Sequence, residues 1–540
     1  MEQQDHKALT AELKNNLSRL MDRRSTWETH WQEVADLIIP RKSDIVDNKV
    51  KGDKRHLEVF DATAIHSLEL LASSLHGMLT SSANRWFDLR FKEAAVNEDD
   101  TAKEWLEDST DKMYLAFARS NFQQEIFEAY HDLVCFGTAC LYIEEDTDDI
   151  IRFSSRHIKE IYISEDAKGM VNCIYRRFKI TAKAAVEKFG LENLSRSIQS
   201  TYKNAPFDDV ELCHVVKPRE MYNPKKQDKS NMPFMSAYFE YNEDHIISQG
   251  GFREFPYVVP RYLKASNEVW GRSPAMAALP DVKVLNKMVE IQLKAAAKQV
   301  DPPLLVPDDS FTLPVRMAPG SINFYRAGSR DRIEPLNIGA NNPLGLNMEE
   351  QRRKAISQTF HVDQLLVTEN RNMTATEVAQ RAEEKMRILG PTLGRLQVEL
   401  LNPTVIRVFN IMFRNNLFKP APEVLVNQEI DVEYVSPMAL AQKGQELSSI
   451  IRGLEIFGSI GQVAPVTDYI DPKGLVKEII KILGIPAKVI RSDAQVQEIT
   501  EQKQAAQQQQ MEMMNAVQES QVAKNVSPAI QAINEADRQQ

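Results

Sequence analysis

The chain has 540 residues, of which 43% are hydrophobic and 26% charged, and its formal net charge is −10. This length exceeds the number of residues that usually fold around a single compact core, so roughly two to four structural regions are expected. A sequence-reading DNA-binding protein is normally basic, so the acidic balance argues against tight general binding of nucleic acid but leaves weak local contact open. No run of about 18 apolar residues occurs and the N-terminus has no apolar core, so neither a membrane-spanning helix nor a signal peptide is expected.

Helical patterns dominate the first part of the chain. Apolar residues at helical spacing predict helices over 1–37, 60–82, 101–119 and 122–136. Pro40 and Gly137 are the predicted stops of the first and last of these helices. Between them, the alternation of side chains in "RWFDLRF", residues 85–91, predicts a short strand.

The pattern becomes mostly β from about residue 150 to about residue 270. Short runs rich in β-branched and aromatic residues predict strands, and 180–190 predicts a helical insertion ended by Gly190. The basic segment 217–229 is predicted to be a solvated hairpin tip.

A helix with two distinct faces is predicted over 274–300. At about 100° per residue, one side carries the apolar residues Val282, Leu285, Val289, Leu293, Ala296 and Val300. The opposite side carries Lys283, Lys287, Lys294 and Lys298. Two hypotheses fit this pattern: a surface helix with a solvated lysine face, or a helix packed sideways in a ring that presents its lysines to a polyanion.

The proline-rich segment 301–347 predicts short strands and turns, and helix resumes over 348–362. A polar loop, Thr368 to Met373, follows. It contains Glu369, Asn370, Arg371 and Asn372, and the stretch 370–372 has no apolar anchors, so more than one conformation is expected there.

A long helix is predicted over 374–416, because apolar residues repeat every three or four positions along it. Pro391 and Pro403 each remove a backbone donor and clash one turn back, so bends are expected near them. Beyond 417 the helices are shorter. The Gln-rich end is compatible with a solvated helix, an oligomeric helical barrel or a disordered tail.

A search for catalytic patterns identifies none. The sequence has no P-loop, GxGxxG, HExxH, GxSxG or EF-hand motif. His131 with Asp132, and His214, stand in apolar contexts typical of structural histidines, and the pair Glu144–Glu145 is typical of a solvated acidic turn. The four cysteines form no CxxC pair. No catalytic residue, cofactor or metal site is therefore predicted.

Five segments in order resemble the head-to-tail connector (portal) proteins of short-tailed double-stranded DNA bacteriophages. None is as specific as a P-loop, but together they span about 380 residues, and past residue 420 the resemblance fades. The segments are "WETHWQEVADLIIP" (27–40), "LASSLHGMLTSSANRWFDLRF" (71–91), "LVCFGTACLYIEE" (133–145), "WGRSPAMAALPDVKVLN" (270–286), and the C-terminal block "NMTATEVAQRAEE" (372–384) with "LGPTLGRLQVELLNPTVIRVF" (389–409).

The resemblance implies an α+β, mainly helical portal fold that assembles as a closed ring, usually of about twelve subunits, around a central channel. It implies this division of the chain: 1–270, wing; 271–300, first stem helix; 301–347, clip; 348–362, second stem helix; 363–373, channel (tunnel) loop; 374–435, wing with the long kinked helix; 436–540, crown and Gln-rich tail.

The resemblance also implies partners and a location. Double-stranded DNA would pass through the channel without sequence specificity during packaging and ejection. The terminase large subunit, tail adaptor or tube proteins, and major capsid and scaffolding proteins would dock on the ring. The location would be the portal vertex of the virion, after assembly in the host cytoplasm and without membrane insertion. The alternatives are a helical scaffold or adaptor without a channel and, with no supporting motif, an assembly-associated nuclease or peptidase.

Overall fold

The computed structural model describes most of the first 301 residues and several later segments. The described residues are 2–47, 49–50, 52–55, 58–93, 99–223, 225–226, 228–301, 304–305, 322, 334–335, 343–365, 389–422, 430–434, 448–456, 474–476, 479, 495–514 and 517. The chain forms two compact units: the first comprises 1–87, 112–417 and 432–439, and the second 88–111, 418–431 and 440–540.

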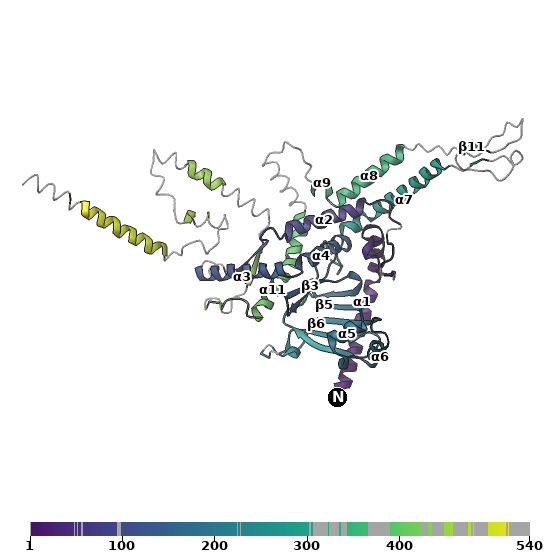
Figure 1. Ribbon diagram of the computed structural model, residues 1–540, viewed down its shortest axis with the longest axis horizontal. Coiled ribbons are helices and arrows are strands. Elements are labelled where there is room, and N and C mark those ends of the chain that lie inside the picture. The colour runs from purple at the N-terminus through teal and green to yellow at the C-terminus, as the bar shows by residue number, and fades with distance from the viewer. Residues whose placement is uncertain are drawn as a thin grey trace, which may run out of the picture. The chain divides into compact units, whose positions relative to one another are not determined.

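Two antiparallel sheets contain most of the described strands of the first unit (Figure 1). The larger has the order β4-β5-β6-β7-β8, with bounds Ile161–Glu165, Val171–Thr181, Asp209–Pro218, Phe234–Glu240 and Ile246–Phe252. The smaller has the order β3-β2-β9, with bounds Ile150–Ser155, Leu141–Asp146 and Tyr257–Val258. All neighbouring strands in both sheets are antiparallel.

Alternating side chains of the larger sheet pack against helices on opposite faces. Helix α1 (Glu2–Ile38) contributes Leu13 and Leu17 to a core with Tyr175 and Val215. On the other face, helices α5 and α6 pack against Phe178, Leu212 and Ile247; their bounds are Ala182–Phe189 and Arg196–Asn204. Successive side chains of a strand point to opposite faces of the sheet. Apolar side chains on both faces are therefore buried here because helices cover each face.

The remaining helices of the amino-terminal half agree closely with the predicted ones. Their bounds are α2, Thr63–Leu79; α3, Asp100–Arg119; and α4, Phe122–Phe136. Gly137 ends α4 in the left-handed conformation, with φ 73°. Strand β1 (Phe87–Phe91) lies where the alternation predicted it. Short 3-10 helices are η1, Pro40–Lys42; η3, Ile158–Glu160; η4, Leu191–Asn193; and η5, Lys229–Asn231.

Two long helices leave the body of the first unit side by side (Figure 1). They are α7, Pro274–Val300, and α8, Pro343–Thr359. Between them the described residues include the antiparallel pair β10 (Leu304–Leu305) and β11 (Glu334–Pro335). The predicted short strands of the proline-rich segment therefore occur at these positions, and the rest of that segment lies outside the described residues.

The boundaries of the second helix of this pair differ from the predicted ones. Helix α8 starts at Pro343 rather than at residue 348, because proline is favourable at a first helical position. After α8, the short helix α9 (Val362–Leu365) occupies the start of the predicted loop 363–373. The sequence prediction also missed α6, whose cap Ser195 accepts a hydrogen bond from the Ile198 N–H.

The long helix near the carboxyl end contains one wider turn. Residues 389–396 are α-helical, Gln397–Leu401 form the π-helical turn η6, and α11 continues over Asn402–Arg414. Pro403 lies just after η6, so the π-turn coincides with the place where proline removes a backbone donor. A π-turn is one of the recognised causes of helix bending. Pro391 lies within 389–396, and the predicted residues before 389 lie outside the described part.

A buried ion pair joins η6 to the segment that precedes α7. The Glu399 carboxylate accepts hydrogen bonds from the N–H, Nε and Nη2 of Arg261, each at 3.0 Å. Arg261 is 1% exposed and also donates to Glu165 and to the Gly169 carbonyl. Arg395 donates to Glu399 from one turn earlier in the same helix. The pair therefore fixes the position of η6 against the body.

The second unit has its own aromatic contacts. Trp105 of α3 lies against the rings of Phe91 and Phe418, and its indole N–H donates to the Lys419 carbonyl at 2.9 Å. Strand β12 spans Ile430–Tyr434, of which 430–431 belong to the second unit and 432–434 to the first. Residues 495–514 of the Gln-rich end form a helix whose side chains are exposed apart from the half-buried Ile499.

Candidate functional site

The lysine face predicted on α7 is exposed, but acidic side chains share it. Lys287 and Lys294 both pair with Glu290, at 2.9 Å and 2.5 Å, within the same helix. Lys283 pairs with Glu33 of α1 at 2.7 Å. Lys298 is exposed near the end of the helix. The structure thus brings four lysines to one face, as predicted, together with two carboxylates that the sequence prediction did not include.

Glu290 is the centre of this arrangement. Its two carboxylate oxygens accept from different lysines, Oε1 from Lys294 and Oε2 from Lys287. The hydrogen bond from Lys294, and then that from Lys287, lower the pKa of Glu290 to about 2, so this carboxylate stays charged to a lower pH than an ordinary glutamate. The spacings of three and four residues are visible in the sequence and could have identified Glu290.

The apolar side of α7 is buried only near the body. Val282 and Leu285 are buried, whereas Leu293 and Val300, which continue the same line, are 55% and 87% exposed. Within a single chain, this side is therefore packed only in the half of α7 nearest the body, and sideways packing in a ring stays a prediction. The physical reason is that the far half extends beyond the helices and sheets that cover the near half (Figure 1).

Exposed apolar residues lie on both sides of the lysines. At about 100° per residue, Val284 and Ile291 lie about 50–70° from the middle of the lysine face in one direction. Leu293 and Val300 lie about 110–130° from it in the other direction. Val284 is 45% and Ile291 56% exposed. The lysine face thus lies between two exposed apolar flanks, a pattern uncommon on a helix with only solvent around it.

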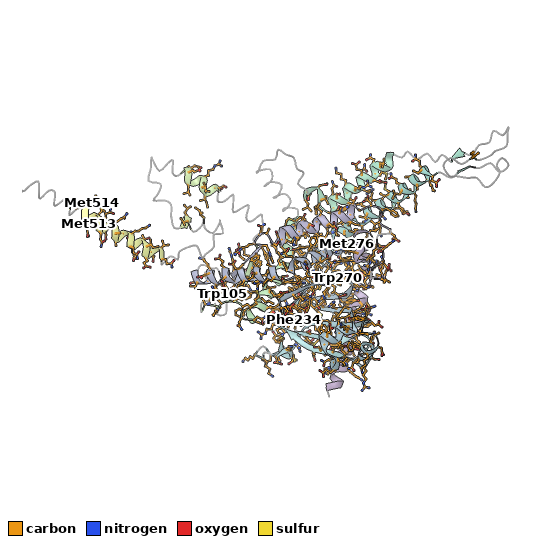
Figure 2. The ribbon with its side chains drawn as sticks, in the orientation of Figure 1. Trp105, Phe234, Trp270, Met276, Met513 and Met514 are labelled. Atoms are coloured by element: carbon orange, nitrogen blue, oxygen red, sulfur yellow. The ribbon has the colours of Figure 1, made fainter. Side chains whose placement is uncertain are left out.

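The sequence "WGRSP" fixes the start of α7. Trp270 packs edge-on against Trp31 of α1, with ring centroids 4.9 Å apart, and lies with Met276 inside the packed body (Figure 2). Ser273 accepts a hydrogen bond from the Met276 N–H and donates to the Cys135 carbonyl. Pro274 occupies the first turn, where its missing N–H has no intrahelical partner to lose.

Close backbone contact completes this anchor. Gly271 lies against Gly137, so that a Cβ on Gly271 would be 2.0 Å from the Gly137 carbonyl oxygen. The Gly271 N–H donates to the Thr138 hydroxyl at 2.9 Å. These close contacts, which leave no space for an additional atom, therefore fix the direction in which α7 leaves the body.

Polar contacts hold the near half of the helix pair. The Asn286 side chain accepts from the Phe60 N–H and donates to the Glu58 carbonyl, both at 2.7 Å. On α8, Arg352 pairs with Asp281 of α7 at 2.7 Å, and Arg353 pairs with Asp61 at 3.0 Å. All of these contacts lie in the halves of α7 and α8 nearest the body of the first unit.

The predicted loop residues Glu369, Asn370, Arg371 and Asn372 lie outside the described residues. Their predicted role and conformations therefore remain predictions. The nearest described residues on either side are Leu365 of α9 and Leu389.

The side chains considered for catalysis have structural contacts. His214 is buried between the Tyr257 hydroxyl and the Ser236 hydroxyl, at 2.7 Å and 3.0 Å. Burial lowers the pKa of His214 well below its usual value, so the ring is neutral at neutral pH. Asp132 pairs with Lys42 at 2.5 Å. Within the described part of the chain, no group of three metal-ligating side chains occurs and no helix is long and apolar enough to cross a membrane.

Comparison with known proteins covers nearly the whole chain. Residues 10–490 match the family described as bacteriophage head to tail connecting protein. The chain belongs to this family. The resemblance carried by the five sequence segments is thereby confirmed.

Relatives within the head-to-tail connecting proteins include named portal proteins. A probable portal protein of Bordetella phage BPP-1 is 32% identical over 507 residues, which cover 91% of each chain. The portal protein of Salmonella phage epsilon15 is 31% identical over 528 residues, 95% of each chain. The portal protein of Enterobacteria phage T3 is 21% identical over 464 residues, 83% of this chain and 82% of that one.

Proposed function

We propose that this head-to-tail connecting protein forms the portal ring at one vertex of the capsid. Genomic DNA would enter the capsid through the ring during packaging and leave through it at infection. The family match and the portal names of three relatives support the proposal. The proposal assigns the chain no catalytic step, so a separate terminase would hydrolyse ATP.

The observation that carries the proposal is the position of the lysine face between two apolar flanks on α7. In a closed ring, each subunit meets its two neighbours through different surfaces. The flank of Val284 and Ile291 on one subunit would contact the flank of Leu293 and Val300 on the next. The face between the flanks then points to the axis of the ring, which gives Lys287 and Lys294 to the channel.

The charge of the chain suits a conduit. Each phosphate that a protein neutralises adds salt-dependent affinity through counterion release, so a strongly basic channel would retain DNA. A net charge of −10 per subunit becomes about −120 over about twelve copies, with cationic rings guiding the strand locally. Such a channel would hold DNA without sequence specificity and let it slide.

The proposed parts follow the structural elements. Helices α7 and α8 would be the stem, and the segment between them the clip, on which the terminase large subunit and later the tail adaptor dock. The two sheets and their helices would belong to the wing. Residues 363–373 would form the channel loop and 436–540 the crown, which faces the capsid interior with its major capsid and scaffolding proteins.

Ile291→Glu is expected to prevent ring assembly. Ile291 would be buried by a neighbour in the ring, and moving a carboxylate from water into that interface is expected to cost several kcal/mol, on the order of 3, even with Lys287 and Lys294 one turn away. Light scattering and negative-stain electron microscopy of the purified variant are expected to show monomers or open fragments under conditions in which the unmodified chain forms rings.

The matched control is Phe207→Glu. Phe207 is 76% exposed and lies between α6 and β6, away from the helix pair. The same charge introduced there should leave assembly intact. Normal rings from Ile291→Glu would contradict the proposed use of α7, and a scaffold or adaptor without a channel would then account better for the chain.

A further inference from the structure

Glu290 lies at one edge of a face otherwise made of lysines, between Lys287 and Lys294 along the helix. At about 100° per residue, Lys283, Lys287, Lys294, Lys298 and Glu290 lie within an arc of about 80° on α7. The Glu290 side chain is 17% exposed, whereas those of Lys287 and Lys294, which cover it, are 67% and 68% exposed. The four lysines and Glu290 form what is called here the α7 charged face.

The contacts of this face partly neutralise its cations. Glu290 binds Lys287 and Lys294 through separate oxygens, and Glu33 of α1 binds Lys283. Two carboxylates thus meet four ammonium groups, which leaves two positive charges per subunit. A ring of subunits built this way presents about half of the cationic charge that its lysines alone suggest.

The lysine pairs are weak enough to exchange. The side chains of Lys287 and Lys294 are 67% and 68% exposed, and ion pairs of this kind are screened by water and salt. A DNA phosphate approaching Lys287 or Lys294 would therefore compete with Glu290 for the same ammonium group. The lysine can exchange one oxygen anion for another without being left unpaired.

We propose that Glu290 sets the strength of DNA contact on the α7 charged face by competing with phosphates for Lys287 and Lys294. This inference rests on the proposed channel and adds a residue that tunes it. Glu290 lowers the positive charge of the face. The charge that remains is enough to guide a polyanion but not enough to retain it. The exchange between carboxylate and phosphate would recur at successive phosphates as the strand moves.

The test uses the assembled full-length ring and a linear, blunt-ended duplex as the probe. Affinity is measured over a range of salt concentrations for the unmodified ring and for Glu290→Gln. Freeing two lysines per subunit is expected to tighten binding about tenfold or more near 0.1 M salt and to make the slope of log K against log salt more negative by at least about 1. Electron microscopy of each sample verifies that the rings are intact.

Two further variants separate this effect from other causes. Glu290→Gln with Lys294→Gln restores the net charge of the face and should return the affinity and the slope toward the unmodified values. Glu350→Gln removes the same charge from an exposed position on α8 and should change neither. An unchanged slope for Glu290→Gln, an equal effect of Glu350→Gln, or a double variant that binds as tightly as Glu290→Gln would each overturn the proposal.

Failure of the channel itself would look different. If the unmodified chain forms no ring, the proposed function fails whatever Glu290 does. If rings form and Lys287→Gln with Lys294→Gln binds the duplex as the unmodified ring does, the ring stands but its α7 face does not contact DNA, and the role of Glu290 is refuted.

Discussion

Gly271→Ala is expected to destabilise the first unit by about 3 kcal/mol, near the upper end for added atoms in a packed interior. The new Cβ would lie 2.0 Å from the Gly137 carbonyl oxygen and 2.9 Å from its carbonyl carbon. Both neighbours are backbone atoms, so no side-chain rotation relieves the clash. Gly137 is itself fixed by its left-handed conformation at the end of α4. Thermal or urea unfolding of the purified variant measures the loss.

The matched control is Gly77→Ala. Gly77 lies on the exposed side of α2, and nothing lies within 4 Å of a Cβ built there. Alanine at an exposed helical position is expected to stabilise by about 0.5–1 kcal/mol. Unchanged stability of Gly271→Ala would show that the backbones of α4 and of the α7 entrance are not in the close contact described above.

Arg261→Met is expected to destabilise the chain by about 3–5 kcal/mol. The substitution leaves the buried Glu399 with Arg395 as its remaining cation and removes the donor to the Gly169 carbonyl. A buried carboxylate that loses a charged partner retains the cost of desolvation without the compensating attraction. The effect is measured by urea unfolding, as the shift of the midpoint between the variant and the unmodified chain when the slope of the free energy of unfolding against urea concentration is the same for both.

A double variant and a surface control sharpen this prediction. Arg261→Met with Glu399→Leu removes both charges and should recover much of the lost stability, because apolar residues of similar volume can replace a buried ion pair. Arg152→Met breaks an exposed pair, 3.8 Å from Asp146, and should change stability by less than about 1 kcal/mol. Equal losses from Arg261→Met and Arg152→Met would contradict the structural role given to the buried pair.

Helical and strand periodicity predicted most of the elements, because local spacing determines which face of an element is buried. The helices α1, α2, α3 and α4 and the strand β1 lie where the patterns placed them. The amphipathic face of α7 was also correct near the body, where a partner covers it.

The turn η6 had a sequence signal that the prediction did not use. Along the predicted stripe, Leu396 and Leu400 are four apart and Val405 follows Leu400 after five, with the buried Leu401 between them. A five-residue step matches the i to i+5 hydrogen bonds of a π-helix. The prediction treated this step as part of a continuous α-helix, and the π-turn was therefore missed.

Contacts between distant segments could not be predicted in the same way. Lys283 meets Glu33, 250 residues away, and Arg261 meets Glu399, 138 residues away. A single sequence gives the charge of each residue but not which segments meet, since that depends on how the sheets and helices pack. The far half of α7 is the converse case, because its apolar residues Leu293 and Val300 continue the pattern but remain exposed among the described residues.

The most direct test of the account is a reconstruction of the purified assembly by electron microscopy. The account predicts a closed ring with a central hole wide enough for duplex DNA, in which α7 stands beside its neighbours and directs Lys287 and Lys294 toward the axis. Monodisperse monomers under assembly conditions, solid discs, or rings in which both lysines face away from the hole would contradict it.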